Sequence, residues 1–274
     1  MKIERPNPHV GAIITGVNVK SMTDDEFAIV YQTWIDCGVI CVRGQSLDMP
    51  EYLGYSRRFG RLKCHLVKKT RDPNHPEITV MGTDKFNADG TPNEAILKRG
   101  VGWHTDSPWD QEVCKGTQLY GHAIPSRGGD TLFVSMYNAW ETLPQRLKKR
   151  LDGVCAEFIY GGRKSISAQL LNEEDRALSP AVHPVVRRHE DSGRTSLYIN
   201  PVHISRLKDM EERESDALIG EILPYLAPAH TQPYRHRWQV GDVVIWDNRC
   251  TMHSATGDYP VAEDRIHWRV TIMQ

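Results

Sequence analysis

The stretch Cys114–Met136, CKGTQLYGHAIPSRGGDTLFVSM, decides the fold class of this 274-residue chain. Two runs rich in strand-forming residues, Cys114–Ala123 and Asp130–Met136, flank a turn that contains one proline and two glycines. Apolar and β-branched runs bounded by such turn residues are typical of β-strands. We therefore expect a sheet in the middle of the chain.

The rest of the chain repeats this pattern with helices around it. Six further strand-like runs are Val154–Tyr160, Val182–Arg187, Ser196–Asn200, Arg235–Val240, Asp242–Trp246 and Arg265–Ile272. Eight strands predict a jelly roll, that is, a double-stranded β-helix. Earlier in the chain we expect strands at 11–19 and 39–42 and helices from about Thr23 and over 49–59, and later helices at about 138–151 and 211–226. Because no linker divides the chain, residues 1–274 are expected to form a single mainly β domain with flanking helices.

Composition limits the partners of the protein. With 34 basic and 35 acidic residues, the chain has no overall field that would attract nucleic acid or an anionic membrane. It shows neither the apolar segment of a signal peptide nor the roughly 20 apolar residues of a membrane span. We therefore expect a cytoplasmic protein. Its six cysteines form no C-x-x-C pair and are expected to be reduced.

A polar segment at residues 82–102 has turn residues and no clear periodicity, so we expect an active-site loop or lid there. It leads into His104-Thr-Asp106, where an imidazole and a carboxylate at i and i+2 can project to the same side of an extended backbone. A distant histidine would complete a set of two histidines and one carboxylate, which leaves positions open on a metal for a bidentate cosubstrate and dioxygen. His253, which follows the apolar run DVVIW after a short turn, is our candidate.

The His-x-Asp/Glu pattern occurs three times, so spacing alone leaves other interpretations open. His75-Pro-Glu77 lies in a proline-bounded turn, and His189-Glu-Asp191 lies in RRHEDSGR, which we interpret as a solvated turn. Only His104 has aromatic residues on both sides, as expected in a lined pocket. On spacing alone, His104 is equally well explained as a hydrogen-bonded structural histidine.

Five blocks together resemble the taurine and aryloxyalkanoate dioxygenase family of iron(II)/2-oxoglutarate enzymes. They are WHTD at 103–106, GGDTLF at 128–133, HPVVR at 183–187, WDNRCTMH at 246–253 and RIHWR at 265–269. The blocks stand in the family's order and cover most of the chain. The resemblance implies an oxygenase that uses Fe(II), 2-oxoglutarate and O2.

The resemblance also implies roles for particular residues. His104, Asp106 and His253 correspond to the metal ligands, and Thr131 and Arg265 to the residues that bind the distal carboxylate of 2-oxoglutarate. His65 and Arg269 correspond to residues that contact the primary substrate. Without the family, Thr131 would be interpreted as a strand former and Arg269 as a surface charge.

The implied reaction is hydroxylation of a C–H bond of a small anionic organic compound, with release of succinate and CO2. The substrate would be an aryloxyalkanoate, a sulfonate or another carboxylate, and the enzyme a homo-oligomer. Taurine-specific members carry an asparagine shortly before WHTD, whereas this chain has Arg99-Gly100-Val101-Gly102, which argues against taurine. Two alternatives are a zinc-type metallohydrolase, since three ligands and an open position also activate water, and a non-catalytic jelly roll that binds a metal or a small acid.

Overall fold

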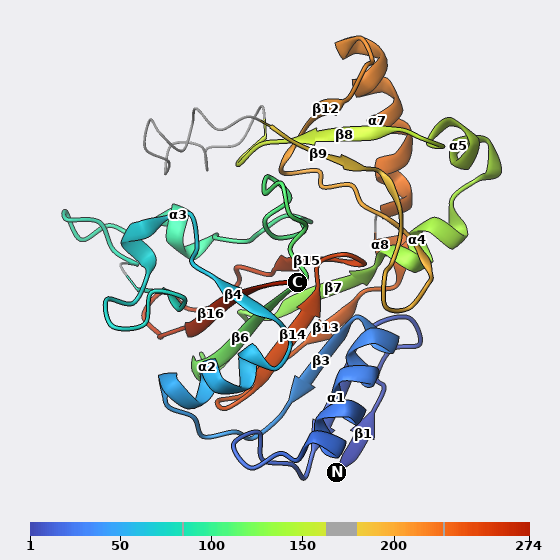
Figure 1. Ribbon diagram of the computed structural model, residues 1–274. Helices are drawn as coiled ribbons and strands as arrows, with labels where there is room; N and C mark the ends of the chain where they lie inside the picture. The colour runs from blue at the N-terminus through green and yellow to red at the C-terminus, as the bar shows by residue number, and fades with distance from the viewer. Residues whose placement is uncertain (84, 163–179, 227) are drawn as a thin grey trace.

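The computed structural model describes residues 1–83, 85–162, 180–226 and 228–274, and its centre is a large sheet of eight strands (Figure 1). Seven strands follow in the order β1 (Lys2–Glu4), β2 (Ala12–Thr15), β3 (Val39–Val42), β14 (Val243–Asp247), β6 (Gly116–Ala123), β16 (Ile266–Met273) and β4 (Arg61–Lys63). The eighth, β5 (Thr79–Met81), also pairs with β16. Strands from both ends of the chain are thus neighbours in one sheet.

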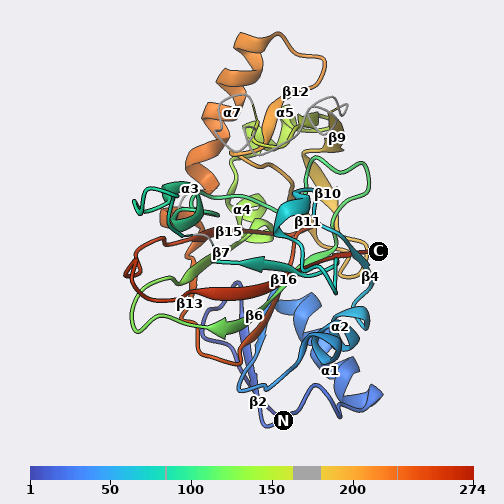
Figure 2. The ribbon, with the colours of Figure 1, turned by 90° about the vertical axis from the view of Figure 1, so that its left-hand side faces the viewer.

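A smaller sheet packs against one face of the large sheet (Figure 2). Its order is β13 (Tyr234–His236), β7 (Thr131–Ser135) and β15 (Thr251–Ala255). A buried cluster joins the two, with Leu119, Val244 and Trp246 from the large sheet and Phe133 and Tyr234 from the small one. Every strand pair in the two sheets is antiparallel except β2–β3, and two packed sheets of this kind confirm the predicted jelly roll.

Two helices, α1 (Asp24–Cys37) and α2 (Met49–Arg57), cover the other face of the large sheet (Figure 2). Both begin with a capping box, in which Thr23 or Asp48 accepts a hydrogen bond from the backbone of the N3 glutamate and that glutamate bonds back to the cap. Helix α1 ends at Gly38 with φ 69°, a left-handed conformation that suits glycine. These helices confirm the prediction.

The remaining elements pack around a second apolar core, above the small sheet in Figure 1. They are the three-stranded sheet β12 (Ile204–Leu207), β8 (Cys155–Phe158) and β9 (Ala181–Pro184), the hairpin β10 (Val186–Arg188) and β11 (Thr195–Leu197), and the helices α4 (Met136–Thr142), α5 (Gln145–Arg150), α7 (Glu212–Leu226) and α8 (Pro228–Thr231). Helix α4 begins directly after β7, so no linker separates this part from the small sheet.

Some predicted boundaries differ from the structure. The helix expected at 138–151 is two helices, because Pro144 holds Leu143 in an extended conformation between them. The strand expected at 182–187 is likewise divided into β9 and β10. The expected loop at 82–102 contains a short helix, α3 (Glu94–Leu97). A 3-10 turn, η1 (Lys68–Thr70), lies earlier in the chain, before this loop. None of the helices in the described part of the chain is long and apolar enough to cross a membrane.

Candidate metal centre

The structure brings His104, Asp106 and His253 together, with one ligand atom of each residue within 4.8 Å of the others. His253 lies in β15, a strand that the sequence pattern did not predict. His104 pairs with it through two backbone hydrogen bonds, His104 N to His253 O at 3.0 Å and His253 N to His104 O at 2.8 Å. The two imidazoles therefore project from directly opposed backbone positions.

The backbone that carries Asp106 is fixed by buried polar side chains. Asn248 Oδ1 accepts the Asp106 backbone N–H at 3.1 Å, and Asn200 donates to the Thr105 carbonyl at 2.7 Å. The Thr105 hydroxyl donates to the Thr251 carbonyl at 2.7 Å. Groups that hold a ligand in this way set its orientation before any cation arrives.

Hydrogen bonding and burial set the protonation states that a divalent cation needs. His104 Nδ1 lies 2.7 Å from the Gly102 carbonyl, which can only accept, so the proton is on Nδ1 and Nε2 keeps its lone pair. Burial, supported by the charge of His104, lowers the pKa of His253 to about 3, so this ring is neutral at pH 7. Burial alone would raise the pKa of Asp106, but Arg269 and both histidines outweigh it and lower that pKa. The triad thus offers the neutral His253 imidazole, the Nε2 atom of His104 and an ionised carboxylate.

The carboxylate of Asp106 keeps one oxygen free. Its Oδ2 is buried and has no hydrogen-bond partner, and the nearest ring nitrogen, His253 Nε2, is 3.7 Å away. A buried charged oxygen without a partner is costly, and a bound cation would remove that cost. The donor set therefore fits a divalent metal ion.

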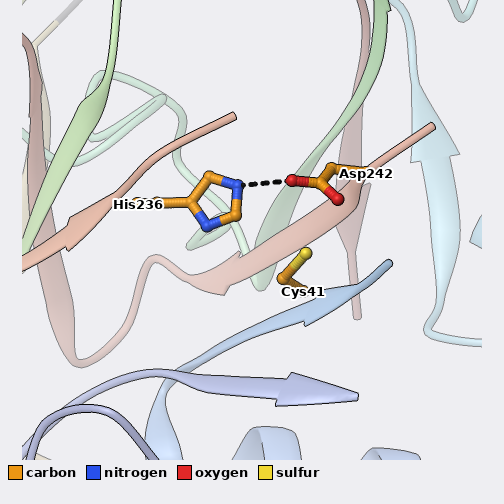
Figure 3. A group of neighbouring side chains, drawn as sticks. All are labelled: Cys41, His236 and Asp242. Carbon is orange, nitrogen blue, oxygen red and sulfur yellow. Dashed lines mark ion pairs between the residues drawn. The ribbon is translucent and has the colours of Figure 1, made fainter. Parts of the chain in front are cut away.

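Two other clusters in the described residues have the composition of a metal site, and neither has a free carboxylate. In the first, Cys41, His236 and Asp242 (Figure 3), the His236 ring lies 3.1 Å from Asp242, and Arg43 donates to both oxygens of Asp242 at 3.0 and 3.1 Å. Arg43 thus occupies both oxygens of Asp242, whereas Arg269 leaves Oδ2 of Asp106 free. This cluster is a buried ion pair between β3, β13 and the start of β14.

The second cluster corrects a sequence-based expectation. His189, which we placed in a solvated turn, is only 2% exposed, and its Nε2 lies 2.9 Å from Asp247. Arg249 donates to both oxygens of the same carboxylate, at 2.9 and 2.7 Å. The turn is therefore tied to the core by a buried hydrogen bond from His189 to Asp247. Cys250, the third member of the cluster, has no free carboxylate beside it.

The positions of Arg265 and Thr131 leave hydrogen-bond donors available. Arg265 Nε donates to the Gly129 carbonyl at 2.8 Å, and its terminal nitrogens have no acceptor in the described residues. Thr131 Oγ1 accepts from Trp238 Nε1 at 3.0 Å, so its own hydroxyl proton remains free to be donated. Arg265 lines a cavity together with Met81, Gly82, Ile96, Leu97, Arg99, Ala255, Gly257 and Tyr259.

Arg269 lies beside the triad. Its side chain is buried, and one terminal nitrogen is 3.3 Å from Asp106 Oδ1. Its neighbour in β16, Trp268, faces the core under α1 and α2, so Arg269 faces the opposite side, toward the small sheet. The alternative interpretation of Arg269 as a surface charge is therefore wrong.

His65 is buried and neutral. Burial, followed by the charges of Arg269 and Arg99, lowers its pKa to about 2. Its Nδ1 accepts the backbone N–H of Val67 at 3.1 Å, so the proton of the neutral ring is on Nε2. His65 therefore offers a hydrogen-bond donor.

Comparison with known proteins decides the family. Residues 2–271 match the family described as "Taurine catabolism dioxygenase TauD, TfdA family". The chain belongs to the TauD/TfdA family. It is 34% identical over 227 residues to the alpha-ketoglutarate-dependent 2,4-dichlorophenoxyacetate dioxygenase of Burkholderia sp. (strain RASC), covering 78% of this chain and 75% of the relative. It is 27% identical over 270 residues to the (S)-phenoxypropionate/alpha-ketoglutarate-dioxygenase of Sphingobium herbicidovorans, covering 96% and 91%.

Solved structures confirm the fold of this TauD/TfdA family member. A putative alpha-ketoglutarate-dependent taurine dioxygenase from Burkholderia xenovorans superposes with a TM-score of 0.82 at 24% identity, covering 99% of this chain and 92% of the other. AAD-2 in complex with Mn(II) and N-oxalylglycine gives a TM-score of 0.82 at 22% identity, covering 100% and 97%.

As a TauD/TfdA family member, the protein is an iron(II)- and 2-oxoglutarate-dependent dioxygenase, with O2 as its second cosubstrate. Neither the metallohydrolase nor the non-catalytic binding protein is supported by any of these relatives.

Sequence reasoning missed part of an aromatic wall beside the triad of this dioxygenase, although Trp246, at the end of the apolar run DVVIW, was a candidate for the pocket wall. His203 lies with its ring centroid 6.2 Å from that of His104, and Trp109 and Tyr160 pack on His203 with centroids 4.7 and 5.8 Å away. Trp246 forms another side, 4.6 Å from the His253 ring. Trp109 follows the WHTD block and was noted only as part of a pocket, whereas His203 and Tyr160 carried no recognisable signal.

Proposed function

We propose that His104, Asp106 and His253 bind Fe(II) in this enzyme. The observation that carries the proposal is the free Oδ2 of Asp106 between two imidazoles, one with its Nε2 lone pair free and the other neutral. When bound, iron(II) with 2-oxoglutarate supplies the activation of dioxygen that allows hydroxylation of a C–H bond. The protein supplies the orientation of these groups and the exclusion of water.

Arg265 and Thr131 are proposed to bind the distal carboxylate of 2-oxoglutarate. The free terminal nitrogens of Arg265 and the free hydroxyl proton of Thr131 are donors that suit a carboxylate. Gly129 makes this arrangement possible, because a Cβ atom there would lie 2.9 Å from both Cδ and Nε of Arg265. The second glycine of the GGDTLF block is thus explained by the close approach of Arg265. The first, Gly128, is explained by the Asp258 carbonyl, whose oxygen would lie 2.5 Å from a Cβ atom there.

Arg269 and His65 are proposed to contact the primary substrate, a small anionic organic compound. The acids and sulfonates named for relatives, which include 2,4-dichlorophenoxyacetate and (S)-phenoxypropionate, support an aryloxyalkanoate or sulfonate. An aromatic group would pack on Trp109 and Tyr160, and the Nε2–H of His65 would donate to the anion. Hydroxylation would release succinate and CO2.

We further propose one domain over residues 1–274, with 82–102 as an active-site lid. Contacts at both ends of the lid support this: Lys85 pairs with Asp264 at 2.7 Å, and Ala255 N donates to the Gly100 carbonyl at 2.8 Å. A cytoplasmic location, a homo-oligomeric state and the absence of nucleic-acid and membrane partners remain part of the same proposal, in line with the near-zero net charge.

Succinate formation tests the function. Protein loaded anaerobically with Fe(II) would be given 2-oxoglutarate, oxygen and a panel of aryloxyalkanoates, sulfonates and other small acids. We expect one class of acid to stimulate succinate formation. His104→Ala should abolish it, whereas His75→Ala, which removes the histidine of a competing His-x-Glu pattern, should leave it unchanged. Substrate-stimulated succinate from the His104→Ala protein would contradict the metal assignment.

A further inference from the structure

His267 is a buried histidine whose hydrogen-bonding groups are unused. It lies in β16, between Arg265 and Arg269 in the sequence, and its side chain is fully buried. Neither ring nitrogen has a hydrogen-bond partner in the described part of the chain. A neutral imidazole carries one N–H donor and one acceptor, and leaving both buried without partners is costly. Packing alone therefore does not explain a histidine at this position.

The ring of His267 projects into the space between the two packed sheets. Its neighbour Trp268 packs under α1 and α2, so His267 points to the opposite face of the large sheet, toward the small sheet. Across the strand pair, His267 stands opposite Met81 of β5. Met81 packs against the cluster between the sheets and lines the same cavity as Arg265. His267 is therefore next to the proposed 2-oxoglutarate site.

Trp238 connects His267 to the other side of that site. The two rings are nearly perpendicular, with 4.4 Å between their centroids, and the indole Nε1 donates to the Thr131 hydroxyl at 3.0 Å. On β6, the residue opposite His267 is Gly121, where a Cβ atom would lie 3.4 Å from the indole ring. A glycine thus leaves room for Trp238. Thr131 from the small sheet and His267 from the large sheet both lie beside this one indole.

The protonation state of His267 suits a hydrogen-bond donor and not an ion pair. Burial, followed by the charges of Arg265 and His236, lowers the pKa of His267, so the ring is neutral at pH 7. Its one N–H group can donate to an anion without adding a further buried charge.

We propose that His267 donates its ring N–H to the distal carboxylate of 2-oxoglutarate. This inference rests on the proposed function, in which Arg265 and Thr131 bind that carboxylate. A carboxylate has about four lone-pair sites, of which the two ends of the Arg265 fork and the Thr131 hydroxyl fill three. His267 supplies the fourth donor. An apolar residue would fill the same space but would leave the last site of the carboxylate unpaired.

Two ligands isolate this contact. 2-Oxoglutarate and 2-oxopentanoate have the same chain length, but the second ends in a methyl group where the first has its distal carboxylate. Each would be titrated calorimetrically, under anaerobic conditions, into protein loaded with Fe(II). In His267→Leu, 2-oxoglutarate should bind roughly tenfold or more weakly, because a hydrogen bond to a charged group is lost. Binding of 2-oxopentanoate should change less than about threefold. An equal change for the two ligands would overturn the proposal.

Further variants separate the hydrogen bond from the shape of the ring. His267→Gln and His267→Asn place an amide N–H near the positions of the imidazole Nε2 and Nδ1 atoms, so one of the two should recover part of the affinity for 2-oxoglutarate. His122→Leu makes the same change at an exposed position of β6, where the ring stacks on Trp268, and should bind both ligands as the wild type does. Equally weak binding in all three His267 variants would assign the effect to packing against Trp238.

Arg265→Leu distinguishes failure of this inference from failure of the proposed function. If Arg265 binds the distal carboxylate, this variant should weaken the binding of 2-oxoglutarate far more than that of 2-oxopentanoate. If Arg265→Leu has this selective effect and His267→Leu does not, only the role of His267 is wrong. If neither variant is selective, the proposed site for the distal carboxylate is wrong as well.

Discussion

At the scale of single residues, Gly129 controls the position of Arg265. Its φ of 67° and the 2.9 Å approach of Arg265 leave no space for a side chain. Gly129→Ala should displace the guanidinium and raise the KM for 2-oxoglutarate by roughly tenfold or more, with a smaller effect on kcat. Gly153→Ala is a matched control, because it has a similar φ of 70° and open space around its Cβ position. Equal effects of the two variants on KM would show that backbone strain alone is responsible.

Asn248 positions Asp106 without touching the metal site itself. Its Oδ1 accepts the Asp106 N–H, and its Nδ2 donates to the Thr117 hydroxyl at 2.9 Å. Asn248→Ala should weaken Fe(II) binding by about 10- to 100-fold, as measured by anaerobic metal titration. Gln111→Ala, an exposed change with one hydrogen bond to a backbone carbonyl, should leave the metal affinity unchanged. Wild-type affinity in Asn248→Ala would mean that the His104–His253 backbone pair is sufficient to organise the triad.

At the scale of elements, the proposed lid should be protected from proteolysis when ligands bind. Leu97 and Arg99 of this segment line the same cavity as Arg265, so bound 2-oxoglutarate and substrate should hold the 82–102 segment in place and slow its cleavage. Cleavage after Lys85 or Lys98 would be followed with trypsin in the presence of Fe(II), 2-oxoglutarate and a turned-over acid under anaerobic conditions. A rate that is the same with and without these three components would contradict closure of the segment. Cleavage after Lys20, outside the lid, provides the internal reference.

The elements also show how far the sequence could predict the fold. The bounds of five elements were predicted to within about two residues: helix α1 and strands β3, β6, β7 and β14. Each of these elements has a local signal, such as the capping box at Thr23. Four strands of three to five residues escaped prediction, since so short a run shows no periodicity: β1, β4, β12 and β15. The antiparallel partner that makes β15 a strand, β7, is more than a hundred residues away.

The candidate site, like the fold, could be predicted from the sequence only in part. His104, Asp106, His253 and Arg265 lie in blocks that resemble a family, so their proximity could be expected. His189 could not be placed from its polar turn, because the Asp247 that buries it is 58 residues away. His203 and Tyr160 have no motif, and their positions beside the triad follow only from tertiary contacts. Local pattern predicts elements, whereas the wall of a site depends on contacts between distant segments.

At the scale of the whole molecule, burial of neutral histidines makes stability depend on pH. Burial lowers the pKa of His65 to about 2 and those of His203 and His253 to about 3. In the unfolded chain each should titrate near 6.5. Between these values the unfolded state binds more protons than the native state, so the free energy of unfolding falls as the pH falls below about 6.5 and is flat above about 7.5.

This dependence is measured by urea unfolding of metal-free protein between pH 5 and pH 8. Each such histidine contributes a slope of about 1.4 kcal/mol per pH unit well below pH 6.5, so the midpoint should decrease steadily from pH 6.5 to pH 5. His203→Asn removes one of the three and should reduce the slope; its Nδ1 accepts only the Gly161 N–H at 2.9 Å. A midpoint that is constant from pH 7.5 to pH 5 would show that these rings are protonated without cost and that the site is open to water.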